Sequence, residues 1–150
     1  MALVQIVSGI IEDKYGRFLL VEGGGGEFKL PTEQVDAEKG EQPVDALRRG
    51  IREKTSYVIV NPLLLDHHYD RGYKGDELEF FDFYAIRGSG VYVSMKISRV
   101  RWVDIYFLRA MQNQFPQNTT DCHRIDLLFE HKSTKQVSGF SGLNTAYARY

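Results

Sequence analysis

The sequence predicts an α+β domain in which a mixed β-sheet lies between helices. Three observations predict it: a β-rich hairpin opens the chain, one amphipathic helix follows a glycine-rich connection, and antiparallel strands then precede further helical segments. With 150 residues, the chain can bury about two thirds of the surface that its unfolded form exposes. We therefore expect one domain over residues 1–132, followed by a mobile or late-docking tail over 133–150.

The first strands are expected to form a hairpin. Residues 4–12 and 17–22 are rich in β-forming side chains, and the segment 13–16 between them begins with Asp and ends with Gly. The four glycines at 23–26 lack the Gly-Lys-Ser/Thr ending of a P-loop, so we interpret them as a connection between strands. Residues 28–30 resume an extended pattern, and the polar segment 32–41 is predicted to be a loop.

One amphipathic helix is expected from Pro43 to about Ser56. Proline fits the first turn of a helix, where its missing N–H group costs nothing. Apolar side chains recur at helical spacing on one face: Val44, Leu47 and Ile51. Gly50 lies inside this helix, at a cost of roughly 1 kcal/mol relative to alanine. Either another group approaches the backbone closely at this point, or the cost is tolerated.

The second half predicts a long hairpin and two further helices. The expected elements, in order, are extended segments 57–60 and 63–69 around Pro62, a turn-rich segment 70–76, strands 77–87, 91–94 and 99–104, a helix over 105–114, a loop over 116–120, and a helix over 121–130 capped by Thr119 or Thr120. His67 and His68 are adjacent on a strand, so their rings should face opposite sides and not share a metal ion.

Composition narrows the functional classes. The formal net charge of -1 gives no whole-chain attraction to nucleic acid or anionic lipid. A single cysteine, Cys122, excludes an intrachain disulfide and fits a reducing compartment, so we expect a cytoplasmic protein. No apolar run approaches the ~18 residues of a membrane span, and no membrane partner is expected.

One pattern runs from Leu30-Pro31 through Glu41, with seven residues before Arg49, to Ile51 and Glu53. It resembles the sequence box of the Nudix (MutT-like) family, hydrolases of nucleoside diphosphates linked to another moiety. The order of elements also resembles the Nudix α/β/α sandwich, and the segment 97–105, "ISRVRWVDI", is similar to a late strand of that fold. The resemblance covers roughly residues 3–130.

The box is degenerate at several positions. Thr32-Glu33 stand where the family has two glycines, two extra residues precede Glu41, and Val35 takes the place of the first glycine of the box. On the helix, Gly50 and Lys54 take the places of glutamates, and Ser56 takes the place of the closing glycine. Positions 50, 53 and 54 share one helical face, where three carboxylates could hold Mg²⁺ against a diphosphate. Here that face carries one carboxylate, Glu53, beside an ammonium, which is a poor site for a hard cation.

The leading hypothesis is a Nudix-fold protein that binds a nucleotide or nucleoside-diphosphate-linked ligand with little or no hydrolysis. Its site residues are Glu53 as a residual catalytic group and Arg49, Arg71, Tyr73 and Lys74 as ligand-binding groups. Glu53 can instead form an i, i+4 ion pair with Arg49.

Two alternatives remain open at this point. The first is an active pyrophosphohydrolase that holds Mg²⁺ or Mn²⁺ through Glu41, Glu53 and a carboxylate outside the box, with candidates Glu38, Asp76, Glu77 and Glu79. The second is an RNA-binding or protein-interaction module that uses the tip formed by Arg71, Tyr73 and Lys74. The resemblance also implies a homodimer as one form of the protein.

Overall fold

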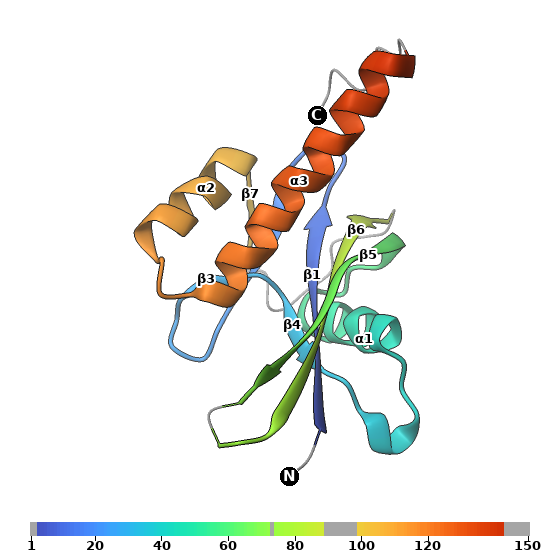
Figure 1. Cartoon of the computed structure of the whole chain (residues 1–150), viewed down its shortest axis with the longest axis vertical. Coiled ribbons are helices and arrows are strands. Elements are labelled where there is room, and N and C mark those ends of the chain that lie inside the picture. Colours follow the sequence, from blue (N-terminus) through green and yellow to red (C-terminus); the bar gives the residue numbers. More distant parts are fainter. Residues whose placement is uncertain (1–2, 73, 89–98, 143–150) are drawn as a thin grey trace.

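The computed structural model describes residues 3–72, 74–88 and 99–142, with side chains up to residue 134. The elements, in chain order (Figure 1), are β1 (Leu3–Glu12), β2 (Phe18–Glu22), β3 (Phe28–Lys29), β4 (Thr32–Gln34), the 3₁₀ helix η1 (Ala37–Lys39), α1 (Pro43–Thr55), β5 (Ile59–Arg71), β6 (Glu77–Arg87), β7 (Val100–Val103), α2 (Ile105–Gln114) and α3 (Thr119–Gly142).

The sheet is mixed, as the sequence predicts. Its main strand order is β3-β2-β1-β6-β5, while β4 pairs with β1 and β7 pairs with β2. The β1–β6 pair is parallel, and every other strand pair is antiparallel. Since β1 joins both halves of the sheet, it is the central strand of the fold.

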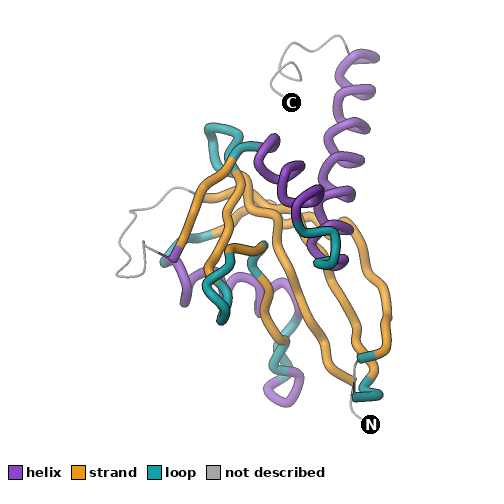
Figure 2. Tube along the Cα trace, turned by 90° about the vertical axis from the view of Figure 1, so that its left-hand side faces the viewer, coloured by secondary structure: helices purple, strands orange, loops and turns teal. Residues whose placement is uncertain are grey.

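Helices cover both faces of this sheet. One buried cluster lies under α1 and includes Val7, Leu47 and Ile51. A second cluster lies on the opposite face under α2 and α3 and includes Leu108 and Leu128. Figure 2 shows the strands between these helices, which confirms the α/β/α sandwich. Among the described helices, none combines the length and the apolar character needed to cross a membrane.

The regular elements agree closely with the sequence predictions. Helix α2 has the predicted bounds, and α1 begins at Pro43. Strands β5 and β6 form the predicted long hairpin, and Pro62 lies at a register shift between Val60 and Leu63 on the outer strand β5. Proline is tolerated there because an edge strand has a side without a ladder partner. The glycines at 23–26 connect β2 to β3 through a turn in which the Gly26 N–H donates to the Gly23 carbonyl.

The prediction of a loop over residues 32–41 is wrong. This segment contains β4, which pairs in antiparallel register with Ile6–Ser8 of β1, and the short helix η1. A strand of three polar residues has no apolar alternation to reveal it, and its hydrogen-bonding partner lies more than twenty positions earlier in the chain.

Helix α3 is longer than the predicted segment 121–130. It runs from Thr119 to Gly142, so the expected boundary at residue 132 falls inside a helix. Lys132 is buried and its ammonium lies 3.1 Å from Glu12 Oε1 at the end of β1, which ties this part of α3 to the sheet. The strand predicted over 91–94 lies outside the described residues. Whether residues 133–150 behave as a late-docking tail stays a prediction.

Candidate functional site

The glycine inside α1 has a specific neighbour. A Cβ atom added at Gly50 would lie 2.5 Å from Oε2, 2.9 Å from Cγ and 3.0 Å from Cδ of Glu33 on β4. Real Cβ atoms essentially never approach other heavy atoms so closely, so the Glu33 side chain would have to shift to admit a side chain at position 50. Of the two explanations for this glycine, the structure favours the close approach of another group.

Two of the departures from the Nudix box are thus linked in space. The Nudix resemblance leads one to expect a glycine ahead of the box at the position of Glu33, and a glutamate at the position of Gly50. In the structure, the Glu33 carboxylate lies beside the 50, 53 and 54 face of α1.

The Glu33 carboxylate is paired with cations from α1. Lys54 Nζ lies 3.2 Å from Glu33 Oε2, and it also donates to the Thr32 carbonyl at 3.0 Å. Arg49 Nη1 lies 3.6 Å from Glu33 Oε1. The Lys54 ammonium therefore lies against the Glu33 carboxylate. A divalent cation at this face would need an oxygen of that same carboxylate as a ligand.

Glu41 is also committed to a partner. Arg49 Nε donates to Glu41 Oε2 at 2.9 Å, Arg49 Nη2 donates to Oε1 at 3.1 Å, and the Asp36 backbone N–H donates to the same Oε1 at 2.9 Å. These hydrogen bonds, the one from Arg49 first, lower the pKa of Glu41 to about 2. The second Arg49 Nη2 contact is to the Gln34 carbonyl, at 3.0 Å. Arg49 thereby joins α1 to the segment that carries Glu33 and Glu41.

Glu53 forms the ion pair with Arg49 that its spacing predicts. The two charged atoms are 3.7 Å apart, and 64% of the Glu53 side chain is exposed, so the pair adds little stability. The three carboxylates of this face, Glu33, Glu41 and Glu53, all lie close to Arg49. This donor set does not fit Mg²⁺ or Mn²⁺ as it stands, because each carboxylate already faces a cation of the protein.

Of the four candidate carboxylates outside the box, Glu79 alone is buried. It accepts hydrogen bonds from Gln5 Nε2 at 2.9 Å and Tyr69 OH at 2.9 Å, and its Oε2 lies 2.6 Å from His67 Nε2. The hydrogen bonds, the one from Gln5 first, lower the pKa of Glu79. An ionised carboxylate with three partners is a structural anchor for β5 and β6 rather than a free base.

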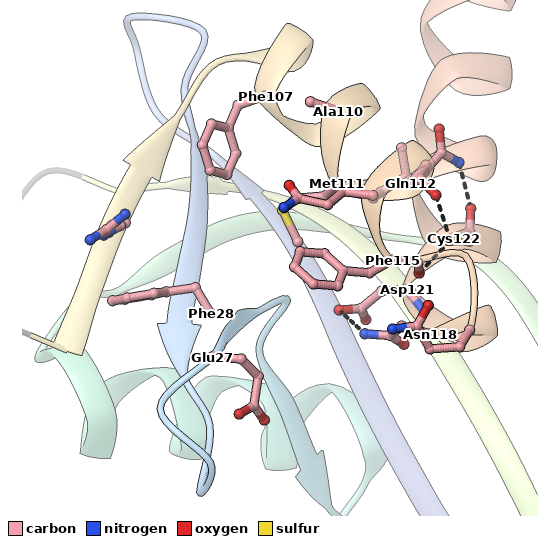
Figure 3. A pocket seen from close by; sticks show the side chains of 14 residues that line it. Glu27, Phe28, Phe107, Ala110, Met111, Gln112, Phe115, Asn118, Asp121 and Cys122 are labelled. Carbon is pink, nitrogen blue, oxygen red and sulfur yellow. Dashed lines mark hydrogen bonds between the residues drawn. The ribbon is translucent and has the colours of Figure 1, made fainter.

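A cavity of about 440 Å³ lies on the other face of the sheet, between α2, the start of α3, and strands β3 and β7 (Figure 3). Its walls are mostly apolar, with three aromatic rings, Phe28, Phe107 and Phe115. Phe107 and Phe115 are 44% and 46% exposed, and the Arg101 guanidinium stacks 4.4 Å from the Phe28 ring. Such a volume and such walls are typical of small-molecule sites that take a planar group.

A few polar groups converge at one end of this cavity. Asn118 and Asp121 line it, and the Asn118 amide and the Asp121 carboxylate lie 3.4 Å apart. Asp121 also accepts from the Leu30 backbone N–H at 3.2 Å. Cys122 lies in the same wall, and burial raises the pKa of its thiol, so the thiol is protonated at neutral pH.

One short segment connects the cavity to the α1 face. Phe28 lines the cavity, and Glu33 follows five residues later beside Gly50. Five extended residues span at most about 17 Å, which bounds the distance between the Cα atoms of Phe28 and Glu33. Thr32 contacts α1 and α3, because its carbonyl accepts from Lys54 Nζ and its hydroxyl lies 3.5 Å from Arg124 Nη1.

The predicted tip residues lie elsewhere. Arg71 ends β5 and Lys74 lies in the turn that leads to β6, and neither lines the cavity. Figure 1 shows this turn at the end of the sheet away from α2. Tyr73 is outside the described residues. RNA binding and ligand binding through this tip stay predictions.

The sequence could have indicated Glu33 but not the cavity. Glu33 and Gly50 are both departures from the same box, and considering them together suggests an exchange. The cavity residues come from β3, β7, α2, α3 and the connections next to them, so no local pattern in the sequence groups them.

Comparisons with known proteins agree on the fold. No protein-family model and no curated protein matches the sequence. A NUDIX hydrolase from Nitrosomonas europaea is 24% identical, with 80% of this chain and 88% of that chain covered and a TM-score of 0.57. The NUDIX domain of NrtR from Shewanella oneidensis, solved in complex with ADP ribose, is 17% identical. The match covers 87% of this chain and 89% of that chain, with a TM-score of 0.66. A MutT from a study of Aliivibrio salmonicida and Vibrio cholerae is 19% identical, with 83% and 98% covered and a TM-score of 0.60.

Proposed function

This chain has the Nudix fold, and on that premise we propose that it binds a nucleotide or nucleoside-diphosphate-linked ligand with little or no hydrolysis. It would then act as a binding or regulatory module in the cytoplasm. The planar base would lie in the cavity between α2 and α3.

The contact between Lys54 and Glu33 carries this proposal. Hydrolysis in this fold is expected to need a divalent cation held by carboxylates, and here the ammonium lies 3.2 Å from the carboxylate beside Gly50. A divalent ion would have to displace this ammonium and compete with Arg49 for Glu41 and Glu53.

The cavity supports the nucleotide part of the proposal. Its volume falls in the range of small-molecule sites, and its half-exposed aromatic rings offer stacking surfaces. The NUDIX domain of NrtR, with the same fold, is complexed with ADP ribose. ADP ribose is therefore the first ligand to test.

A second candidate function is an active pyrophosphohydrolase. One observation favours it: Glu33 restores a carboxylate beside the position that Gly50 leaves without a side chain. Glu33, Glu41 and Glu53 would then hold Mg²⁺ or Mn²⁺, provided that Lys54 moves away from Glu33.

A turnover assay separates the two functions. The purified chain would be incubated with Mg²⁺ or Mn²⁺ and with ADP ribose, nucleoside diphosphate sugars, dinucleoside polyphosphates and nucleoside triphosphates. We expect saturable binding by calorimetry with no release of a nucleotide product. Turnover that is abolished by both Glu33→Gln and Glu53→Gln would overturn the binding hypothesis in favour of the hydrolase.

The converse experiment restores the box. The triple substitution Glu33→Gly, Gly50→Glu and Lys54→Glu removes the obstructing side chain and places carboxylates on the helix face together with Glu53. We expect this variant to bind Mn²⁺ more tightly than the natural chain does. The double substitution Gly50→Glu and Lys54→Glu is the matched control, since Glu33 still fills the space at position 50. Equal Mn²⁺ affinity in the triple variant and the natural chain would show that this exchange does not account for a lost metal site.

The cavity is tested separately. Phe107→Ala removes one stacking surface, and base–aromatic stacking is worth about 1–3 kcal/mol, so ADP ribose affinity should fall roughly five- to 150-fold. Tyr106→Ala is the matched control, because the neighbouring Tyr106 is 80% exposed and does not line the cavity. An unchanged affinity in Phe107→Ala would place the ligand elsewhere.

A further inference from the structure

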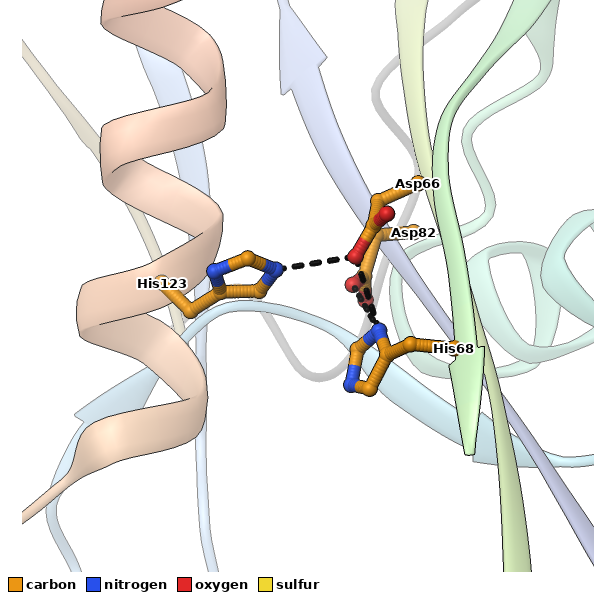
Figure 4. A group of neighbouring side chains, drawn as sticks. All are labelled: Asp66, His68, Asp82 and His123. Atoms are coloured by element: carbon orange, nitrogen blue, oxygen red, sulfur yellow. Dashed lines mark hydrogen bonds and ion pairs between the residues drawn. The ribbon is translucent and has the colours of Figure 1, made fainter. Parts of the chain in front are cut away.

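Four side chains of types that ligate metals, two His and two Asp, converge on the face of the sheet opposite α1 (Figure 4). Asp66 and His68 come from β5, Asp82 from β6 and His123 from α3. Each offers one ligand atom, and these atoms all lie within 4.8 Å of one another. We name these four residues the His–Asp cluster.

The sheet register explains why the cluster forms. Asp66 and His68 are two residues apart on a strand, so both side chains point to the same face. A register shift between Leu64 and Asp66 places Asp66 directly opposite Asp82 on β6. Two carboxylates directly opposite each other on paired strands repel, and the Arg124 guanidinium, 2.9 Å from Asp82 Oδ1, offsets part of this repulsion.

One oxygen of the buried aspartate has no hydrogen bond. Asp82 is 2% exposed, and its Oδ1 accepts from Ser8 Oγ at 2.6 Å and from Arg124 Nε at 2.9 Å. Its Oδ2 has no hydrogen-bond partner, and His68 Nδ1 lies 3.8 Å away from it. A buried carboxylate oxygen without a partner is costly, and a cation in the cluster would satisfy it.

The other distances in the cluster suit a small metal ion. Asp66 Oδ2 lies 2.8 Å from His68 Nδ1 and 2.9 Å from His123 Nε2. In a tetrahedral zinc site with bonds of about 2.0–2.1 Å, the ligand atoms are roughly 3.3 Å apart. Three of the six separations, 2.8, 2.9 and 3.8 Å, lie on both sides of this value, and none of the six exceeds 4.8 Å.

We propose that the His–Asp cluster binds a first-row divalent transition-metal ion, with Zn²⁺ the best match, which ties the β5–β6 hairpin to α3. Two imidazole nitrogens and two carboxylate oxygens suit Zn²⁺, whereas Mg²⁺ and Ca²⁺ take sets made of oxygen alone. The His68 and His123 side chains are 35% and 47% exposed, so the site is open to an ion from solvent. This inference concerns residues other than those of the proposed nucleotide site, because none of the four lines the cavity or lies on the α1 face.

The first test measures metal binding directly. The full-length chain would be freed of metal with a chelator and titrated with Zn²⁺, and separately with Mg²⁺, by calorimetry. We expect one Zn²⁺ per chain and much weaker binding of Mg²⁺. Substitution with Co²⁺ adds a spectroscopic readout, since tetrahedral Co²⁺ with nitrogen and oxygen ligands absorbs visible light. The absence of saturable one-to-one Zn²⁺ binding would overturn the proposal.

Variants then locate the ion. His68→Gln and His123→Gln each remove one ligand, and since even outer-shell changes cost about 10–100-fold in metal affinity, each should weaken Zn²⁺ binding at least ~10-fold. His67→Gln is the matched control: His67 is adjacent in sequence but bonds Glu79 on the other face. Its Zn²⁺ affinity should equal that of the natural chain. Zn²⁺ binding that survives His68→Gln and His123→Gln, or that falls equally in His67→Gln, would show that the ion binds elsewhere.

Thermal unfolding supplies a readout of the tie between β5 and α3. Zn²⁺ should raise the melting temperature of the natural chain and of His67→Gln, because the ion binds only the folded form. The same addition should leave His123→Gln unchanged. Circular dichroism without metal checks that His123→Gln is folded, and its half-exposed position makes folding the expected result.

Discussion

The carboxylate of Glu33 lies in the space that a side chain at Gly50 would occupy, with Glu33 Oε2 at 2.5 Å from the position of an added Cβ atom. A strand residue thereby sets the identity of a helix residue seventeen positions later in the chain. The relationship makes the stability of α1 depend on what stands at position 33.

A double-mutant cycle measures this dependence. Gly50→Ala in a helix interior normally gains about 1 kcal/mol, but here the new Cβ displaces Glu33 from Lys54. We expect little net gain in the natural chain and the full gain of about 1 kcal/mol when Glu33→Ala is also present. Urea unfolding of the natural chain, the two single variants and the double variant gives the coupling free energy between positions 33 and 50. A gain of the same size in both backgrounds would mean that Glu33 leaves this space open in solution.

Ser56→Gly should stabilise the protein. Ser56 caps the C-terminal end of α1 with φ of 68°, a left-handed conformation that costs a residue with a Cβ atom about 1–2 kcal/mol. Glycine avoids this cost but gains freedom in the unfolded chain, so we expect a net increase in unfolding free energy of about 0.5–1 kcal/mol. Ser56→Ala keeps the Cβ atom and should bring no gain. Equal stabilities of Ser56→Gly and Ser56→Ala would contradict the conformational explanation.

The pair of Glu41 and Arg49 should make stability depend on acidity. The folded pKa of Glu41 is lowered from 4.5 to about 2, mainly by the hydrogen bond from Arg49. A lowered folded pKa stabilises the protein above the unfolded pKa, and this contribution is lost as the pH falls from about 4.5 toward 2. The advantage of the natural chain over Glu41→Gln in urea unfolding should therefore be full at pH 6 and shrink across this range. When Arg49→Met is also present, the difference in unfolding free energy between Glu41 and Glu41→Gln should largely disappear. A difference that does not change with pH, with or without Arg49, would be evidence against the Glu41–Arg49 pair.

Arg124→Met should be strongly destabilising. Arg124 bridges Asp82 and Asp121 at 2.9 Å each, and all three side chains are at most 6% exposed. Removing one partner from a buried ion pair leaves an uncompensated charge and typically costs about 3–5 kcal/mol. Lys39→Met is the control: its pair with Asp36 is 3.7 Å long and its side chain is 83% exposed, so the change should stay within about 0.5 kcal/mol. A cost below about 1 kcal/mol in Arg124→Met would show that the bridge is not formed in solution.

The sequence predicts elements with strong local patterns and misses features made by pairing. The bounds of α2 and the β5–β6 hairpin follow from apolar periodicity and turn residues. Strand β4 has three polar residues and becomes a strand only through its pairing with β1. Local pattern carries no information about such a partner.

The same limit applies to the two candidate sites. The His–Asp cluster joins Asp66 to His123, which are 57 positions apart. The one local signal is Asp82, which interrupts the apolar residues 80–86. The residues of the α1 face lie within a few positions of one another, so their helical spacing can be read from the sequence. The contact between Glu33 and Gly50 instead depends on how β4 packs against α1.

The parallel pairing of β1 with β6 has a consequence for how the chain folds. Ten consecutive residues of β1 pair with β6, from Leu3 opposite Glu77 to Glu12 opposite Ile86. Every one of these pairs closes a loop of more than seventy residues, and such distant contacts slow folding. A chain that leaves the ribosome from its N-terminus lacks half of its central ladder until residue 86 has emerged. We therefore expect fragments that end before β6 to stay unfolded, and the complete domain to form late and in one cooperative step.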